Sequence, residues 1–154
     1  MKKIGNYTMR GQYKPDGGFN FDNPDRITLF DGRFDTGYRI TKFVVWGIGI
    51  ETGQDNDVLG LLATENLGPS NVFFDASDQR QVAWAANRGA TFADVDGYQN
   101  GIIDPDNMIV EDLFIYGFSG DQSTTGVNYI IELEKYDISD WQGALAMVRN
   151  RSQA

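Results

Sequence analysis

An alternation of apolar and polar residues near the end of the chain is the feature that most constrains its fold. Within residues 127–136, positions 127, 129, 131 and 133 are apolar and most of the positions between them are polar. Successive side chains of a β-strand point to opposite faces, so this pattern predicts a strand with one packed and one wetter face. The packed face would carry Val127, Tyr129, Ile131 and Leu133.

Composition extends the prediction of strands to the whole chain of 154 residues. Gly, Asp and Asn favour tight turns and number 18, 17 and 11, whereas Glu and Lys favour helix surfaces and number five each. Further strand-like runs lie at residues 26–30, 38–50, 58–63, 71–74, 81–86 and 108–116, and residues 87–107 form the longest break. We predict an all-β fold of about seven to nine strands, an antiparallel β-sandwich of jelly-roll or Greek-key type, with a small closed barrel as the alternative.

The first 24 residues predict an irregular N-terminal arm, because glycines and prolines interrupt any regular pattern there. Phe19 and Phe21 would anchor this arm on the domain or on a neighbouring copy. Residues 25–154 would then form a single β-sandwich domain, which is the default for a chain of this length.

The end of the domain predicts one short helix at about residues 140–150. Ser139 and Gln142 have the spacing of a capping box, and apolar residues recur at helical spacing after them. A helix this short needs a packing partner, which would be the sheet or another subunit. The predicted intersubunit contact therefore consists of Phe19, Phe21, Trp141, Leu145 and Val148.

The chain contains neither histidine nor cysteine. Their absence excludes Ser-His-Asp and Cys-His catalytic arrangements, disulfides, and metal sites built on imidazole or thiolate. Paired carboxylates are the remaining route to catalysis. Glu111 and Asp112 are adjacent in a predicted strand and would point to opposite faces. Glu132 and Glu134 share a face, but solvent-facing residues of an amphipathic strand explain them more simply, so we expect no enzymatic activity.

The protein carries 22 acidic and 13 basic residues, a formal net charge of −9. All the acids lie in residues 11–148, whereas residues 1–10 and 149–154 carry five bases. The acidic residues 11–148 would repel the phosphate backbone of a nucleic acid, which argues against nucleic acid as a partner over a broad face. The basic ends would bind an acidic neighbour, such as another copy, or simply be solvated. The sequence predicts no membrane-spanning helix and no export signal.

A loop rich in Asp and Asn gives the best metal-like pattern. Counted from Asp96 as the first position of a calcium loop, Asn100, Gly101 and Asp104 fall where such a loop places oxygen ligands and its glycine. Two other ligand positions hold residues that do not fit, and a strand is expected directly afterwards. Asp96, Asn100 and Asp104 are therefore weak calcium candidates, with a solvated loop as the alternative, and we expect no other cofactor.

Three tryptophans, Trp46, Trp84 and Trp141, offer a second functional interpretation. With nearby tyrosines and with Asp and Asn acceptors they could form a platform on which a sugar stacks. Packing in an all-β core is the simpler explanation of such aromatic residues.

Two segments give the chain a family resemblance. LFDGRFDTGYRI (residues 29–40) and ELEKYDISDWQGALAMVRNRSQ (residues 132–153) resemble small virion proteins of marine bacterial viruses. The resemblance implies a capsid-associated, minor capsid or decoration-type component of a bacteriophage particle, and it transfers no functional residue. We therefore expect a non-enzymatic virion protein that contacts itself as a homo-oligomer and other virion proteins. The alternative is a carbohydrate- or receptor-binding β-sandwich module, with or without calcium.

Overall fold

The computed structural model of the protein describes residues 2–14, 23–33, 35–47, 58–68, 74–87, 100–119 and 126–139. These residues form eight strands and no helix, which confirms the expected all-β fold over this part of the chain. The strands are β1 (Lys2–Tyr13), β2 (Asp25–Ile27), β3 (Thr36–Gly47), β4 (Val58–Ala63), β5 (Gln81–Asn87), β6 (Asn100–Ile103), β7 (Leu113–Ser119) and β8 (Val127–Asp137).

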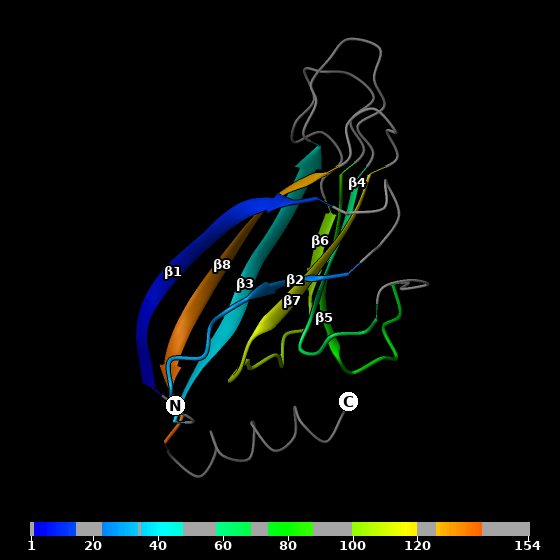
Figure 1. Ribbon diagram of the computed structural model, residues 1–154. Helices are drawn as coiled ribbons and strands as arrows, with labels where there is room; N and C mark the ends of the chain where they lie inside the picture. The colour runs from blue at the N-terminus through cyan, green and yellow to red at the C-terminus, as the bar shows by residue number, and fades with distance from the viewer. Residues whose placement is uncertain are drawn as a thin grey trace.

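The strands form two antiparallel sheets that face each other in a sandwich-like arrangement (Figure 1). One sheet has three strands in the order β1-β8-β3, and the other has five in the order β2-β7-β4-β5-β6. β1 and β8 pair along their whole lengths, so the two ends of the described chain lie together in one sheet.

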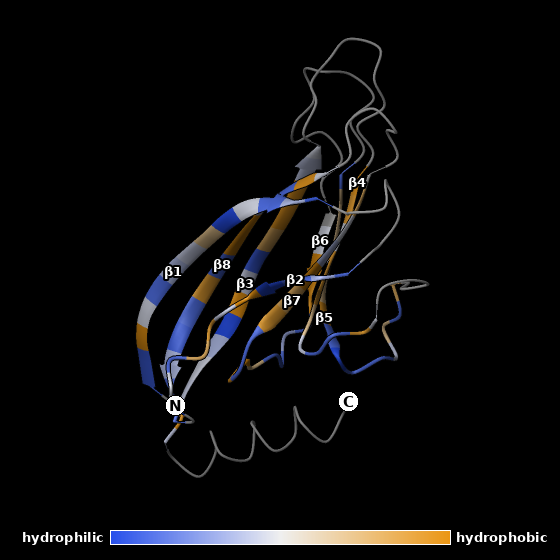
Figure 2. Ribbon diagram, viewed as in Figure 1, coloured by the Kyte–Doolittle hydropathy of each residue, from blue (hydrophilic) through white to orange (hydrophobic). Residues whose placement is uncertain are grey.

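An apolar core fills the space between the two sheets. The inward face of the three-stranded sheet contributes Phe43 and Val45 of β3, together with Ile131 and Leu133 of β8. The facing sheet contributes buried side chains from four strands, Ile27, Val58, Leu62, Ala83, Ala85, Leu113 and Ile115. Figure 2 shows apolar and polar residues alternating along β3 and β8. The alternation predicted over residues 127–136 is therefore confirmed, with the apolar set on the packed face.

The prediction of an irregular arm over residues 1–24 is wrong for β1, which is a regular strand of 12 residues. Two glycines that suggested irregularity have other roles. Gly5 follows a register shift, a β-bulge, in the pairing of β1 with β8. At Gly11 an added Cβ would lie 2.9 Å from the hydroxyl oxygen of Tyr129, so this position leaves room for a packed ring.

The strand predicted over residues 108–116 begins later, at Leu113, and the predicted break over residues 87–107 contains β6. The structure gives a physical reason for the late start. Ile109 exchanges two backbone hydrogen bonds of 2.7 Å with Tyr38. The residues before Leu113 therefore pair with the edge of β3 and do not extend β7 towards its N-terminus. This pairing is a single bridge between two segments and not a strand.

The strands predicted at residues 38–50 and 127–136 correspond to β3 and β8. Of the strand predicted at residues 26–30 only the start is formed, since β2 ends at Ile27, and residues 71–73 of the strand predicted at 71–74 lie outside the described residues. Residues 58–63 form β4 and residues 81–86 lie in β5, the run for which a short helix was the alternative. Within the described residues there is no helix of the length and apolarity that would cross a bilayer. The predicted helix at residues 140–150 lies outside the described residues.

Candidate interaction surface

β1 is the outer strand of the three-stranded sheet. It pairs with β8 on one side, and no described strand pairs with it on the other. In Figure 1 the first part of β1 forms the left-hand margin of the molecule, and its end curves across β8 towards the other strands. An edge strand presents a row of unpaired N–H and C=O groups, which another extended chain can pair with.

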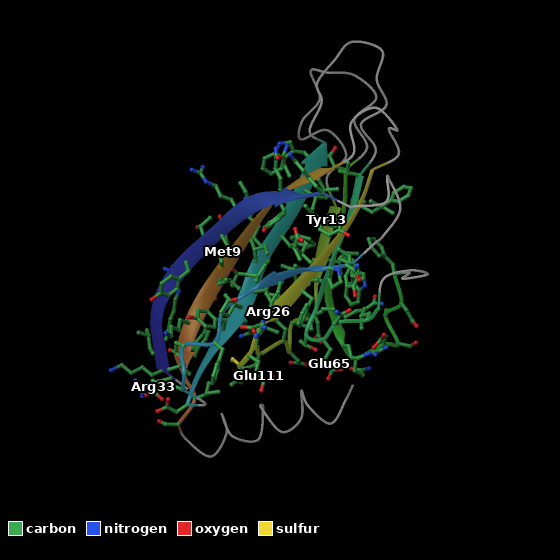
Figure 3. All side chains as sticks on the ribbon, in the orientation of Figure 1. Met9, Tyr13, Arg26, Arg33, Glu65 and Glu111 are labelled. Atoms are coloured by element: carbon green, nitrogen blue, oxygen red, sulfur yellow. The ribbon has the colours of Figure 1, made fainter. Side chains whose placement is uncertain are left out.

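The apolar side chains beside this edge are unusually exposed. Ile4 is 54% exposed and Tyr7 is 48% exposed, and both lie in β1. Tyr7 stands edge-on to Tyr38 of β3, with ring centroids 6.1 Å apart, so its ring reaches across β8 towards β3. Met9, also in β1, is half-buried (Figure 3). Ile4 and Tyr7 therefore leave exposed apolar surface on β1, whose outer edge pairs with none of the described strands.

The outer face of β1 is polar and basic. Asn6, Thr8, Arg10 and Gln12 all lie opposite outward-facing residues of β8 and are exposed. Residues 2–14 include four bases and no acid. This segment is therefore basic in a chain of net charge −9, and Glu132 and Glu134 of β8 lie beside it on the same face.

An ion pair joins β1 to the neighbouring strand. Lys3 Nζ lies 2.5 Å from Glu134 Oε2, and this contact lowers the pKa of Glu134. Glu132 and Glu134 do share the outer face of β8, as expected, and Glu132 is exposed between Thr8 and Lys42 of the flanking strands. Glu134 thus makes a charged cross-strand contact, whereas Glu132 is exposed to solvent.

A second group of charges lies at the end of the sheet where β1 begins, where Figure 3 places Arg33. Lys135 Nζ donates to Asp31 Oδ2 at 2.8 Å and lies 5.4 Å from the ring centroid of Tyr38. This hydrogen bond, aided by those from the Arg33 amide and the Thr36 hydroxyl, lowers the pKa of Asp31 from 3.8 to about 2. The contacts fix the turn before β3 against β8.

Asp112 is the most deeply buried carboxylate of the described chain, at 5% exposure. Its Oδ1 accepts hydrogen bonds from the amides of Leu29 and Phe30, at 3.0 and 3.2 Å, and its Oδ2 accepts one from Arg26 Nε at 2.6 Å. Burial alone would raise the pKa of Asp112, but these donors outweigh it and lower the pKa. Asp112 therefore holds the chain after β2 against the start of β7, while the adjacent Glu111 is exposed.

The calcium candidates are described only in part. Asp96 lies outside the described residues, Asn100 is the first residue of β6, and Asp104 follows that strand. Asp104 Oδ1 accepts a hydrogen bond of 3.0 Å from the amide of Asp106, as in an Asx turn. Within the described ranges no group of three acidic side chains is placed to hold a metal ion.

The structure does not bring Trp46 and Trp84 together. Trp46 lies in β3 opposite Asn128 of the three-stranded sheet. Trp84 lies in the other sheet, where its Nε1 donates to Gln81 Oε1 at 2.9 Å. A single platform made of these two residues is therefore excluded, and Trp141 lies outside the described residues.

The contact residues that the sequence predicted are not the residues that form the exposed surface of β1. Phe19, Phe21, Trp141, Leu145 and Val148 all lie outside the described residues, so their contact stays a prediction. The β1 edge was missed because its glycines suggested an irregular arm. Its signal was nevertheless present, since Tyr7, Met9 and Tyr13 alternate with polar residues as the packed face of β8 does.

Comparison with protein-family models, with curated proteins and with solved structures finds no match. The interpretation of this surface therefore depends on its own residues.

Proposed function

We propose that the protein is a non-enzymatic structural component of a virus particle, located in the virion. It would act through contacts between copies, as a homo-oligomer, or by docking on a shell of other virion proteins. The resemblance of residues 29–40 and 132–153 to small virion proteins of bacterial viruses suggests this class. A C-terminal helix over residues 140–150 is part of the same proposal.

The order of the strands is the observation that carries the proposal. A jelly roll folds a long hairpin of chain into two sheets, so its first strand pairs with its last and its second with its next to last. Here β1 pairs with β8, β2 with β7, and β4 with β5. Jelly rolls are common in viral capsid proteins and in lectins, and this pairing pattern supports assignment to that type.

The remaining jelly-roll pair would be β3 with β6, and these two strands lie next to each other across the sheets. An added Cβ on Gly101 of β6 would collide with the carbonyl oxygen of Phe43 of β3. Immediately after β6, Arg39 donates to the carbonyl oxygen of Pro105, and Tyr38 pairs with Ile109. β6 itself hydrogen-bonds to β5, so the pattern departs from a regular jelly roll at this pair.

A fold does not by itself imply a function, so the surface must supply the rest of the argument. The described carboxylates Asp31, Asp78, Asp112 and Glu134 all make hydrogen bonds or ion pairs with neighbouring protein groups. In contrast, β1 offers a long strand edge with exposed apolar residues. A protein with this surface is suited to binding other proteins rather than to catalysis.

The native mass of the protein tests the proposal. We expect sedimentation velocity to show concentration-dependent association, or co-sedimentation with shell proteins expressed from neighbouring genes. A protein that stays monomeric up to about millimolar concentration, the weak end of protein association, and binds no neighbouring gene product would contradict it.

A carbohydrate- or receptor-binding module is the second candidate, because lectins share the jelly roll. One row of the three-stranded sheet places Gln12, Asn128 and Trp46 side by side, an aromatic ring next to two carboxamides. Trp46→Ala would abolish binding to a glycan array under this alternative, and Trp84→Ala in the other sheet is its control. No binding of the native protein to any glycan would reject it.

A further inference from the structure

We propose that the C-terminal segment of one copy, residues 140–151, docks on the outer face of the five-stranded sheet of a second copy. The inference rests on the proposed structural function and names the surface that receives Trp141, Leu145 and Val148. Such a contact joins two different surfaces, and heterologous contacts of this kind build rings or open arrays.

The outer face of the five-stranded sheet is apolar, although the outer face of an antiparallel sandwich is ordinarily polar. Inward side chains such as Leu62 and Ile115 belong to the core, and the side chains that alternate with them point outward. These outward residues, here called the outer apolar face, are Leu59, Leu61, Ala63, Trp84, Ala86, Ile102, Phe114, Tyr116 and Phe118. Several of them pack with Leu67 as an apolar cluster separate from the core.

Part of this face is covered within the same copy. The Leu67 amide donates a 2.7 Å hydrogen bond to the Tyr116 hydroxyl, which donates in turn to the Gly68 carbonyl oxygen at 3.0 Å. Tyr116 and Leu61 are fully buried, whereas Ile102, in the same cross-strand row, is 56% exposed. The covering therefore ends before β6 and leaves the row open there.

A second exposed apolar side chain lies at this open end. Gln81 Oε1 accepts hydrogen bonds of 2.9 Å from Trp84 Nε1 and from the Asp75 amide, so the residue before Asp75 lies close to the Trp84 ring. That residue, Phe74, is 41% exposed. Phe74, Trp84 and Ile102 therefore form an apolar patch that is open to solvent, and such patches mark interaction sites.

The C-terminal segment has the pattern and the length to cover this patch. Trp141, Leu145 and Val148 share one face of the expected helix, which is too short to be stable without an apolar partner. A helix rises about 1.5 Å per residue, so Trp141 to Val148 span about 10 Å. This is about the distance across three neighbouring strands of a sheet.

The charges of the described residues favour the same pairing. The exposed acids at the end of the sheet where β4 and β6 finish are Glu65, Asp75 and Asp106. Arg80, a base at this end, is already paired with Asp78 at 2.9 Å. The segment carries Arg149 and Arg151 after its apolar stripe, so its basic residues would meet an acidic border.

A second copy must supply the segment. Ile138 is held at the end of β8, in the three-stranded sheet, where its amide donates to the Asp35 carbonyl oxygen at 2.7 Å. Facing sheets lie about 10 Å apart, and the outer apolar face lies a further layer of side chains away. Trp141 is two residues beyond Ser139, which span at most about 7 Å, so it cannot reach this face of its own copy.

Charge substitutions in the patch test the contact on the full chain. Ile102→Glu should raise the dissociation constant of self-association, measured by sedimentation velocity, at least about tenfold, because docking would bury an unpaired charge. Ile4→Glu is the matched control, since Ile4 is an isoleucine of β1 that is 54% exposed, and it should stay within about twofold of the native value. Circular dichroism verifies each fold, and Phe74→Glu tests the same patch if Ile102→Glu does not fold.

Mixing two variants tests the head-to-tail polarity. Leu145→Glu damages the segment and leaves the face intact, whereas Ile102→Glu does the reverse, so each alone should associate weakly. An equimolar mixture should form a dimer and nothing larger, because one intact segment meets one intact face. Native-like association of Leu145→Glu alone, or no association in the mixture, would overturn the proposal.

The outcomes separate this inference from the proposed function. Association that is unchanged by Ile102→Glu would overturn the contact while leaving a self-associating structural protein. A monomer that still co-sediments with shell proteins would likewise refute the contact alone. A monomer that binds no shell protein would refute both.

Discussion

Gly101 of β6 lies so close to Phe43 of β3 that an added Cβ would approach the Phe43 carbonyl oxygen well inside 3.0 Å. The two strands belong to different sheets, and this approach closes one side of the sandwich-like fold. The obstacle is backbone and not the end of a flexible side chain, so it cannot turn away. Glycine is required here because of the close approach rather than because of its torsion angles.

Gly101→Ala should therefore destabilise the protein by about 1–3 kcal/mol, the range for overpacking at a closely packed site. Denaturant unfolding monitored by tryptophan fluorescence would measure the loss. Gly5→Ala is the matched control, because an added Cβ there meets Tyr7 at an ordinary 3.6 Å. Equal effects of the two substitutions would show that β3 and β6 are further apart than described.

Asp112→Ala should lower the free energy of unfolding by about 2 kcal/mol or more, because it leaves the buried Leu29 amide without its acceptor. Asp112→Asn keeps one carbonyl oxygen and should cost less. Glu65→Ala, at an exposed residue, should change stability by no more than about 0.5 kcal/mol. If Asp112→Ala were as mild as Glu65→Ala, Asp112 would not anchor β2 to β7.

The pKa of Asp31 predicts an acid-sensitive contribution to stability. Its pKa is about 2 in the folded protein against an ordinary 3.8, chiefly because Lys135 donates a hydrogen bond to it. A lowered carboxyl pKa stabilises the fold above the ordinary value, and the contribution is lost as the pH falls from about 4 to about 2. Thermal melts of the native protein and of Asp31→Asn should differ at pH 5 and converge near pH 2, whereas a constant difference would contradict the assignment.

The long strands in which apolar side chains alternate with others could be predicted from the sequence. Residues 127–136 and 38–50 each place apolar side chains at every second position over much of their length, and a half-buried strand requires this pattern. The continuous apolar run at residues 58–63 also became a strand, since β4 is central in its sheet and buried along most of its length.

The elements that were missed depend on contacts between distant residues. Gly11 looks like a strand breaker in isolation, and only the ring of Tyr129, far along the chain, explains it. β6 has four residues and is defined by pairing with β5, so its own sequence carries almost no signal. The exposed edge of β1 depends on which strand pairs with β8, which one sequence does not determine.

Asn107 illustrates such a distant contact and gives the last prediction. Its side chain is 3% exposed and lies beside the register shift in β3. Its Oδ1 accepts a hydrogen bond of 2.8 Å from the Ile40 amide, while its Nδ2 donates to the carbonyl oxygens of Asp104 and Ile40, at 2.7 and 3.4 Å. The carboxamide thus takes the place of a strand partner for Ile40.

Asn107→Ala should cost about 2 kcal/mol, because buried backbone groups lose their partners. Asn107→Asp should depend on pH, since an ionised carboxylate would face the Asp104 carbonyl oxygen that now accepts a hydrogen bond. Burial and this repulsion raise the pKa of the new carboxyl in the folded state, so the variant should lose stability as the pH rises above about 4. Urea unfolding at pH 4 and pH 7 checks this, with Asn107→Ala as the control for the pH dependence of the rest of the protein. If Asn107→Asp showed the same pH dependence as Asn107→Ala, the side chain at position 107 would reach water, and the contact between this loop and β3 would be looser than the distances to Ile40 indicate.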